Sequence, residues 1–376
     1  MDDDAPFDLI LLGGGHAHCA VLADWIENGL PADRIALVSP SAHLRYSGMV
    51  PGWIAGQYAE DAGLVDVKAL ALKAGAQFIE DRCIAIDPLA NAVMTGASGL
   101  LRFTFCSIDT GGVGRAAKLL GTDPRLIDVR PIDGLVERLA AVGVAEKTAV
   151  IGGGAGGVEL AFALKNREAG GAQSVALITG KAGLLPDFAR GPREMVRREL
   201  EAQEIAVFES DAVARGGALQ MGDDPQTSAD DPLKSAQIVV AALGSGSPDW
   251  PTAGGLEVDA DGFILADKNQ RSTSHPHIFA VGDVASRQDI RVPRSGVHAV
   301  HAGPGLAANL RRVLSGDEPI RSYRPRKFNL YILSTANEEA IAVYGPVATK
   351  AEWAADLKAW IDKRWLASYA KLTQGL

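Results

Sequence analysis

The sequence predicts an α/β protein in which one strand–glycine turn–helix–strand unit occurs twice. The first copy has an apolar run at 7–12, a triple glycine at 13–15 and then a helical pattern. The second copy has an apolar run at 148–151 and a glycine-rich turn at 152–157. At matched spacing, each copy is followed by another short apolar run, at 34–39 and at 174–179. A short apolar run bounded by glycines is typical of a parallel strand that is buried on both faces.

The glycines of both copies are spaced as in a turn that binds a dinucleotide. In such a turn the first glycine permits the bend, the second lets the backbone approach a pyrophosphate, and the third lets the helix pack on the strand. The helix N-terminus then offers N–H groups and a partial positive charge to the phosphates. The second copy matches in full, at Gly152, Gly154 and Gly157. The first copy has Gly13 and Gly15, but His18 takes the third place, so either that helix stands further from its strand or His18 faces the ligand. The two copies predict two Rossmann-like dinucleotide-binding domains.

Composition excludes several other classes of protein. The chain has 376 residues, of which 47% are hydrophobic and 22% charged, which suits two or three folded domains and not a disordered chain. Its net charge of −9 argues against a nucleic-acid partner. The histidine pairs 16/18, 275/277 and 298/301 have no clustered third ligand, so we expect no metal site. The acidic N-terminus is unlike a secretory signal and no apolar run is long enough to span a bilayer, so we expect a cytoplasmic protein.

The sequence leaves the nicotinamide nucleotide open. An acidic residue at the end of the second strand normally holds the adenosine ribose. The first copy ends instead at Ser39, and the second at Thr179, followed by Gly180 and Lys181. Lys181 either meets the 2′-phosphate of NADPH or is simply solvated, so NADH and NADPH both remain candidates.

Two later segments complete a recognisable pattern. Residues 107–112 form an apolar strand end that runs into glycines. Residues 279–283 end in Gly282-Asp283, and an aspartate at such a strand end can accept hydrogen bonds from ribityl or ribose hydroxyls. With these motifs the chain resembles the two-dinucleotide-binding-domain flavoproteins of the pyridine nucleotide–disulfide oxidoreductase superfamily. The four motifs, at 13–15, 107–112, 152–159 and 279–283, stand in the family's order and frame residues 7–312.

The resemblance implies a domain organisation. A FAD-binding domain would begin at 1–113 and resume at 246–315, and an NAD(P)H-binding domain at 114–245 would be inserted into it. Residues 316–376 would form a small C-terminal α/β region. The polar segment 222–232 is rich in turn-forming residues and predicts an exposed hairpin loop.

The resemblance also implies site residues. Contacts with FAD or the nicotinamide nucleotide are implied at Gly13, Gly15, His16, Ala17, His18, Ser39, Pro51, Thr110, Gly111, Gly152, Gly154, Gly157, Gly244, Gly282, Asp283, Gly296 and Val297. Glu159 is a catalytic candidate beside the nicotinamide, although the helix dipole alone also favours a glutamate there. His298 is a second candidate, near the flavin, because histidine titrates near neutrality and can transfer protons. A helix starting after Pro293 would aim its positive end at the flavin.

Three further segments, 14–18, 46–52 and 293–300, resemble a subgroup related to the type II NADH dehydrogenases. Members of that subgroup are often fused to, or found beside, selenophosphate synthetase. The three cysteines, Cys19, Cys83 and Cys106, include no Cys-x-x-Cys pair, so a flavin-to-disulfide relay is not expected. The sequence thus predicts a FAD-dependent NAD(P)H dehydrogenase, in which hydride passes from the nicotinamide to the flavin and electrons then pass to a quinone-like or other small acceptor.

Two alternative functions stay open. One is a FAD-binding regulatory or interaction protein linked to selenium metabolism. The other is a reductase of a protein electron carrier, for which the basic segment Arg321, Arg324, Arg326 and Lys327 would serve as a docking site. A second copy of the chain, forming a homodimer, is a further candidate partner.

The last 24 residues predict an amphipathic helix. Trp353, Trp360 and Trp365 recur with other apolar residues at three- and four-residue intervals. Basic residues outnumber acidic ones in this segment, although the whole chain is acidic. Tryptophans with basic residues suit a bilayer surface, so the helix either contacts a membrane peripherally or packs on protein.

Overall fold

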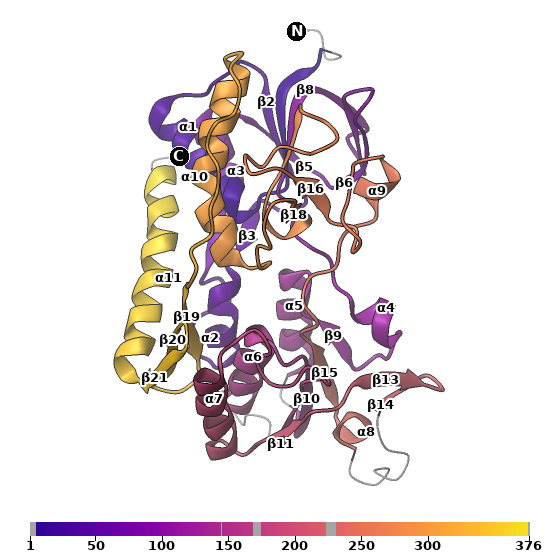
Figure 1. Ribbon diagram of the computed structural model, residues 1–376, viewed down its shortest axis with the longest axis vertical. Helices are drawn as coiled ribbons and strands as arrows, with labels where there is room; N and C mark the ends of the chain where they lie inside the picture. Colours follow the sequence, from indigo (N-terminus) through magenta and orange to yellow (C-terminus); the bar gives the residue numbers. More distant parts are fainter. Residues whose placement is uncertain (1–4, 144, 168–173, 223–230, 375–376) are drawn as a thin grey trace.

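The computed structural model describes residues 5–143, 145–167, 174–222 and 231–374. Figure 1 shows two lobes, one above the other, with a long C-terminal helix along one side of both. Each lobe is built around a mostly or wholly parallel sheet, because the apolar runs that the sequence placed before and after each glycine turn are buried strands. The predicted α/β fold is therefore confirmed.

The upper lobe holds a seven-stranded sheet. Its strands are β1 (Phe7–Leu12), β2 (Ile35–Ser39), β5 (Gln77–Glu80), β6 (Cys83–Asp87), β7 (Ala92–Thr95), β8 (Leu100–Ile108) and β17 (Ile278–Ala280). Along the sheet their order is β5-β2-β1-β8-β7-β6, and β17 pairs with β8. β1 is parallel to both β2 and β8, whereas β6, β7 and the first half of β8 form an antiparallel meander.

Several helices belong to the upper lobe by sequence, and all but α2 lie around its sheet. They are α1 (His16–Asn28), α2 (Val50–Ile54), α3 (Val67–Ala74), α9 (Trp250–Ala253) and α10 (Gly296–Leu314), with the short 3-10 helices η1 (Ser47–Met49) and η2 (Gly282–Val284). Two small pairings, β3 (His43–Arg45) with β4 (Leu64–Asp66) and β16 (Ile264–Ala266) with β18 (Ala285–Arg287), complete the lobe. The helix predicted after Pro293 is present as α10, but it begins three residues later, at Gly296.

The lower lobe holds a five-stranded parallel sheet in the order β12-β11-β10-β15-β9. Its strands are β9 (Leu126–Asp128), β10 (Lys147–Ile151), β11 (Ser174–Ile178), β12 (Ile205–Phe208) and β15 (Ile238–Ala241). Its helices are α4 (Ala116–Leu120), α5 (Ile132–Val142), α6 (Ala155–Lys165), α7 (Arg190–Ala202) and α8 (Pro232–Ser235). A hairpin of β13 (Ala212–Arg215) and β14 (Ala218–Met221) projects from it, and most of the loop predicted at 222–232 lies outside the described residues.

The chain enters the lower lobe and returns from it at two adjacent points, 113 and 246. Val113 and Gly246 exchange backbone hydrogen bonds of 2.9 and 2.8 Å, so the outgoing and returning segments run side by side. A Cβ on Gly112 would meet Ser245, which shows how closely the two segments approach. Domain boundaries at 113, 245 and 315 remain our proposal, and this double crossing supports the first two.

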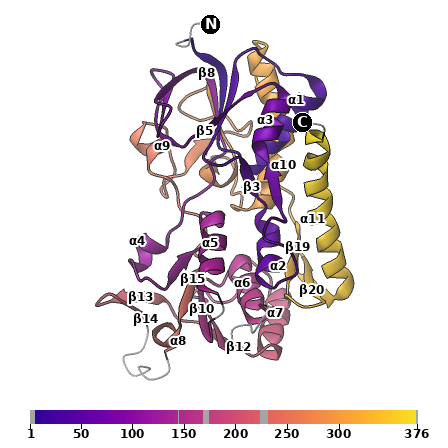
Figure 2. The same cartoon turned by 180° about the vertical axis from the view of Figure 1, so that it is seen from behind.

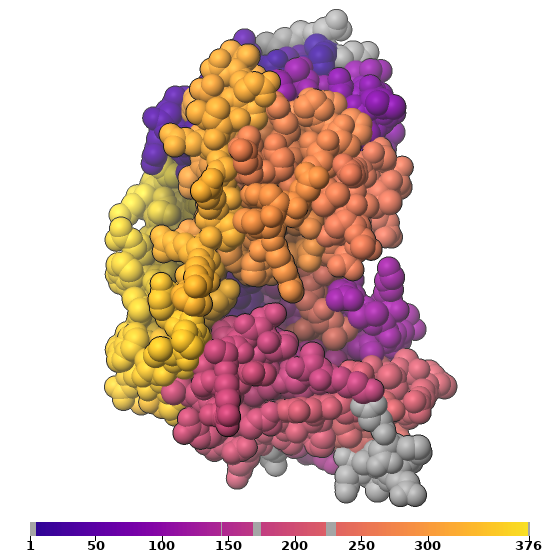
Figure 3. Space-filling model, in the orientation of Figure 1, coloured from indigo at the N-terminus to yellow at the C-terminus, as the bar shows by residue number. Residues whose placement is uncertain are grey.

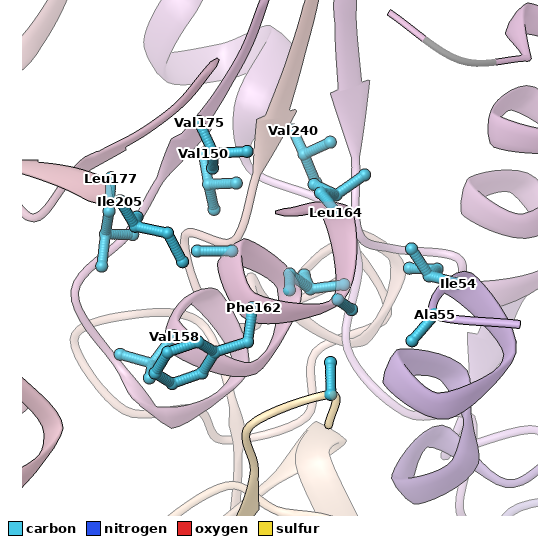
Figure 4. Close-up of a cluster of buried hydrophobic side chains, with 14 of the residues drawn as sticks. Ile54, Ala55, Val150, Val158, Phe162, Leu164, Val175, Leu177, Ile205 and Val240 are labelled. Atoms are coloured by element: carbon cyan, nitrogen blue, oxygen red, sulfur yellow. The ribbon is translucent and has the colours of Figure 1, made fainter. Parts of the chain in front are cut away.

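The two lobes share part of one hydrophobic core. The short helix α2 belongs by sequence to the upper lobe, yet its Ile54 and the following Ala55 lie in the same buried cluster as Phe162 and Leu164 of α6 (Figure 4). Apolar contact of this kind between the lobes fixes their relative position more firmly than a polar interface would. The segment that follows β3 and leads into α2 is thereby held close to α6.

The C-terminal region consists of an antiparallel sheet and one helix. The sheet is β19 (Leu330–Ser334), β20 (Ala340–Tyr344) and β21 (Val347–Ala351), and the helix is α11 (Glu352–Thr373). One face of the sheet packs on α6 and α7, and α11 then rises beside α3 and α1 (Figures 1 and 2). The predicted C-terminal helix is thus present, and it bridges the two lobes.

The three tryptophans of α11 lie on different faces of the helix. Trp365 packs with Leu366 and Tyr369 on the core of the upper lobe, whereas 53% of Trp353 and 57% of Trp360 is exposed. The helix therefore uses one tryptophan for packing and presents two to solvent. No helix in the described part of the chain is long and apolar enough to cross a membrane.

Candidate functional site

A pocket of about 290 Å³ opens at the carboxyl ends of the strands in the upper lobe, where it borders the lower lobe. In Figure 3 this face of the molecule is hollowed between the orange part of the upper lobe and the magenta part of the lower one. The carboxyl edge of a parallel sheet is where α/β proteins bind dinucleotides. The sequence-predicted residues in its lining are Gly13, Gly15, His16, Ser39, Thr110, Gly111, Asp283 and Gly296.

The first glycine turn connects β1 to α1 and is tightly packed. Gly13 has a φ of +90°, and a Cβ there would clash with the backbone of Asp109 at the end of β8. A Cβ on Gly15 would clash with the Asp109 side chain. Only glycine satisfies both demands, so the turn brings bare backbone and the N-terminus of α1 to the pocket.

His18, in place of the third glycine, does not face the pocket. It is fully buried, and its Nδ1 lies 2.6 Å from the Gly13 carbonyl oxygen and its Nε2 2.8 Å from the Ser107 hydroxyl. Burial lowers its pKa to about 4, so the ring is neutral at pH 7. The His18 ring therefore does not face a ligand, which was one of the two alternatives that the sequence left open. It links β8 to the first glycine turn through Ser107 and Gly13.

Asp283 stands at the opposite side of the pocket, at the end of β17. Its Oδ2 accepts a hydrogen bond from Arg130 at 2.6 Å and another from the Ser245 hydroxyl at 2.9 Å. Arg130 follows β9 of the lower lobe, so the ion pair joins the two lobes across the pocket. Charge-assisted pairs of this kind are strong and directional. A carboxylate so placed suits ribityl hydroxyls, as the sequence predicts.

The start of α10 closes the pocket from the side of the upper lobe. Gly296 and Ala299 line it, and the helix points its positive N-terminal end there. His16 lies beside Gly296, and its buried Nε2 has no hydrogen-bond partner among the described residues. Burial lowers the pKa of His16 to about 4, so this ring too is neutral at pH 7. A glycine-lined turn, two helix N-termini, a carboxylate and a free ring nitrogen fit a flavin dinucleotide.

The second glycine turn connects β10 to α6. Gly152 has a φ of +132°, and a Cβ there would fall on the carbonyl oxygen of Ala242. Gly157 sits so close to the Gly152 carbonyl that a Cβ would come nearer than 3.0 Å. Gly154 has open space instead, so its face of the turn is free for a ligand. This pattern fits the pyrophosphate of a nicotinamide nucleotide.

Besides His18, the predicted contacts Ala17, Pro51, Gly282 and Val297 of the upper lobe do not line the pocket. Ala17 is buried and gives its N–H to the Asp109 carboxylate at 2.8 Å, Pro51 is buried in α2, Gly282 lies behind Asp283, and Val297 is partly exposed. Gly244 has a φ of +75° and lies on the segment that returns to the upper lobe.

His298 also lies outside this pocket. Its Nδ1 is 2.7 Å from the Tyr323 hydroxyl, on the far side of the first turn of α10. Its pKa is lowered, first by burial and then by the neighbouring His301. Proton transfer by His298 remains a prediction, and Tyr323 is the polar side chain that its Nδ1 contacts.

Glu159, on α6, belongs to a group of charges that only the tertiary structure assembles. Its Oε1 accepts the Ser334 backbone N–H at 3.0 Å, and Lys358 of α11 faces it. Burial raises the pKa of Glu159, and Lys358 opposes that rise. Lys358 donates to the Gly48 carbonyl oxygen at 2.9 Å and to Asp362 at 3.1 Å. Burial opposes the charge of Lys358, but Glu159 and Asp362 raise its pKa overall.

Sequence reasoning missed Asp109, Arg130, Lys358 and Trp365. Asp109 lies inside the 107–112 motif, but only the threonine and the glycine of that motif were predicted to contact a nucleotide. Arg130 follows a short strand without a motif, and Lys358 and Trp365 counted only as parts of an amphipathic helix. The one available signal was Asp109, because it stands between the last apolar residue of the strand and the glycines of that motif.

The comparisons with known proteins agree with this geometry. The chain is 23% identical over 276 residues to ferroptosis suppressor protein 1 of Taeniopygia guttata. The matched segment covers 71% of this chain and 71% of the relative. It is 24% identical over 313 residues to monodehydroascorbate reductase 5 of Oryza sativa subsp. japonica, where the match spans 76% of this chain and 61% of the relative.

Solved structures share the fold at low sequence identity. The sulfide:quinone oxidoreductase of Aquifex aeolicus superimposes with a TM-score of 0.76 at 17% identity, covering 98% of this chain and 92% of the other. The water-forming NADH oxidase of Lactobacillus brevis superimposes with a TM-score of 0.71 at 19% identity, covering 90% of this chain and 75% of the other.

A family model described as pyridine nucleotide-disulphide oxidoreductase matches residues 7–303, most of the chain. The predictions of an oxidoreductase and of FAD and NAD(P)H as its cofactors are thereby confirmed at the level of the family. The glycine turns at 13–15 and 152–157, together with Asp283, lie within the matched residues. This chain belongs to the pyridine nucleotide-disulphide oxidoreductase family.

Proposed function

We propose that the protein is a FAD-dependent NAD(P)H dehydrogenase that delivers electrons to a small quinone-like acceptor without a redox disulfide. When bound, FAD supplies the electron-transfer chemistry, and the protein positions it. The predicted contacts around the two glycine turns, with Asp283 and Gly296, would hold the two nucleotides. Cys19, Cys83 and Cys106 are free and buried, and burial raises the pKa of each, so the thiols are unreactive.

The observation that carries the proposal is the charge group of Glu159, Lys358 and Asp362 where both lobes meet α11. Asp362 is buried, and Glu159 and Lys358 are half-buried. Removing charges from water is costly, and such positions are often functional. The Lys358 ammonium lies against Gly48, inside the 46–52 segment, and faces Glu159 on the helix that follows the nicotinamide turn. An ammonium held there can stabilise negative charge that develops on a carbonyl oxygen of an acceptor.

The proposal is tested by separating the two half-reactions. Purified protein with FAD is mixed anaerobically with NADH or NADPH, and loss of the visible flavin absorption is followed. We expect rapid loss with one nucleotide. Lys358→Met should keep that rate within a few-fold but lower turnover with a soluble quinone by about 10²-fold, the usual effect of removing one stabilising donor. Lys363→Met, an exposed neighbour on the same helix, is the control.

Two results would count against the dehydrogenase. A bound flavin that keeps its absorption with both nucleotides would favour the regulatory function linked to selenium metabolism. Reduction of the flavin with turnover only in the presence of an iron–sulfur carrier would favour the carrier reductase. That second candidate has an observation in its favour, since Arg321, Arg324, Arg326 and Lys327 are all exposed on the segment between α10 and β19.

We further propose that α11 contacts an anionic membrane surface with its outward face. Trp353, Trp360 and Ile361 are exposed there, and Arg364 lies over the Trp360 ring at 5.2 Å. Aromatic and basic groups together suit the interface of a bilayer. Replacing Trp353 and Trp360 by serine should reduce co-sedimentation with anionic vesicles several-fold. Leu89→Ser, at a still more exposed apolar site on the β6–β7 turn, should leave it unchanged. Equal sedimentation of both variants would exclude this contact.

A further inference from the structure

Asp109 is a buried carboxyl group in the wall of the nucleotide pocket. Only 4% of it is exposed, and it follows β8 directly beside the first glycine turn. Its Oδ2 accepts the backbone N–H groups of Ala17 and His18 at 2.8 and 3.1 Å. Asp109 thus caps the N-terminus of α1, the same positive end that the pocket offers to a phosphate.

Two glycines leave room for this carboxyl group. A Cβ on Gly15 would clash with the Asp109 carboxyl, and a Cβ on Gly282 would lie 2.5 Å from its Oδ1. Gly15 belongs to the turn that fits the pyrophosphate, and Gly282 precedes the carboxylate that suits the ribityl hydroxyls. Asp109 is therefore held between the two parts of the pocket that face FAD.

No positive charge near Asp109, among the described residues, is available to balance a negative charge on its carboxyl group. On the neighbouring α1, the rings of His16 and His18 have pKa values of about 4 and are neutral at pH 7. Burial keeps the thiol of Cys19, which interacts with Asp109, protonated. From η2, the Asp283 carboxylate repels Asp109, and the nearby Arg130 is engaged with Asp283. Burial has the largest effect on the pKa of Asp109 and raises it to about 7. The hydrogen bonds from the N–H groups of His18 and Ala17 act in the opposite direction.

We propose that Asp109 is a positioning residue for FAD that exchanges a proton with solvent when the cofactor binds. The pyrophosphate and the Asp109 carboxylate compete for the N-terminus of α1, so FAD binds to the form in which Asp109 carries a proton. The inference rests on the proposed placement of the FAD pyrophosphate at the 13–15 turn. The proton comes from solvent and remains on the carboxyl group, and no other bond changes.

The direction of the pH dependence follows from this competition. Added negative charge raises the pKa of Asp109 further in the complex, so binding takes up a proton at any pH between the two values. Below about pH 7 the group is already protonated, and FAD affinity is constant. Above about pH 7 the affinity falls as pH rises, by at most tenfold per pH unit.

The test measures FAD binding, not turnover. Apo-protein is titrated with FAD between pH 6 and pH 9, and quenching of flavin fluorescence gives the dissociation constant. For the wild type we expect a constant value up to about pH 7 and a rise of several-fold per unit above it. Asp109→Asn, which keeps the shape and loses the charge, should bind at pH 9 at least as tightly as the wild type at pH 6. A variant with an unchanged slope would overturn the proposal.

A second measurement uses only the wild type and does not depend on the variant folding. Calorimetric titration with FAD at pH 8, in buffers of different ionisation enthalpy, gives the number of protons taken up. We expect net uptake of a large fraction of one proton, and zero uptake would overturn the role of Asp109. Failure of the apo-protein to bind FAD at any pH would instead overturn the proposed function, so the two failures are distinguishable.

Discussion

Replacing Gly157 by alanine is expected to remove most nicotinamide-dependent activity while FAD stays bound. A Cβ at this position would fall on the Gly152 carbonyl oxygen, which is backbone and cannot swing away. The start of α6 must then shift from β10, and overpacking of this kind costs about 1–3 kcal/mol. A displacement near 1 Å at a nucleotide turn lowers kcat/KM on the order of 10²-fold. Stopped-flow reduction by the preferred nucleotide measures the effect, and the flavin-to-protein ratio reports FAD.

The neighbouring glycine supplies a matched control. Gly156 lies on the same helical turn, but a Cβ there would meet nothing within 4 Å. Gly156→Ala should therefore keep its activity, and alanine's higher helix propensity should stabilise the fold by up to about 1 kcal/mol. Equal loss in both variants would show that the turn rejects any added bulk, and equal retention would show that Gly157 does not set the position of α6.

Replacing Asp283 by asparagine is expected to weaken FAD binding strongly. Asp283 is 8% exposed, and its carboxylate accepts hydrogen bonds from Arg130 and Ser245. The variant therefore loses a charge-assisted bond and leaves the Arg130 guanidinium without this partner. Hydrogen bonds to charged groups contribute about 1.5–3 kcal/mol, or roughly 10- to 150-fold in the dissociation constant. FAD titration by fluorescence quenching gives that constant directly.

The control for this variant is Asp261→Asn, an exposed aspartate in the same lobe. It should bind FAD like the wild type. The thermal midpoint should be recorded for both, since Asp283 also links the lobes through Arg130. If Asp283→Asn purifies with a full complement of FAD and an unchanged dissociation constant, the pocket at Asp283 is not where the ribityl chain lies.

The sequence by itself determined the two sheets and their glycine turns. The apolar runs at 7–12 and 148–151 became β1 and β10 because both faces of those strands are covered, and a strand buried on both faces needs a continuous apolar run. Gly152 and Gly157 could be assigned from spacing because the close approach of a helix to a strand is a local requirement. The C-terminal helix was also predictable from its period.

Only the tertiary structure decided how these parts meet. Glu159 and Lys358 are far apart in the sequence, and no local pattern brings α6 to α11. The same holds for Arg130 with Asp283, for the insertion of α2 into the core around Phe162, and for the division of the tryptophans between Trp365 and the exposed pair. Periodicity states which face of an element is apolar but not which partner covers it. Asp109, after a strand, and His18, in the first turn of a helix, show the same limit at atomic scale. The direction of each side chain depends on neighbours that long-range packing supplies.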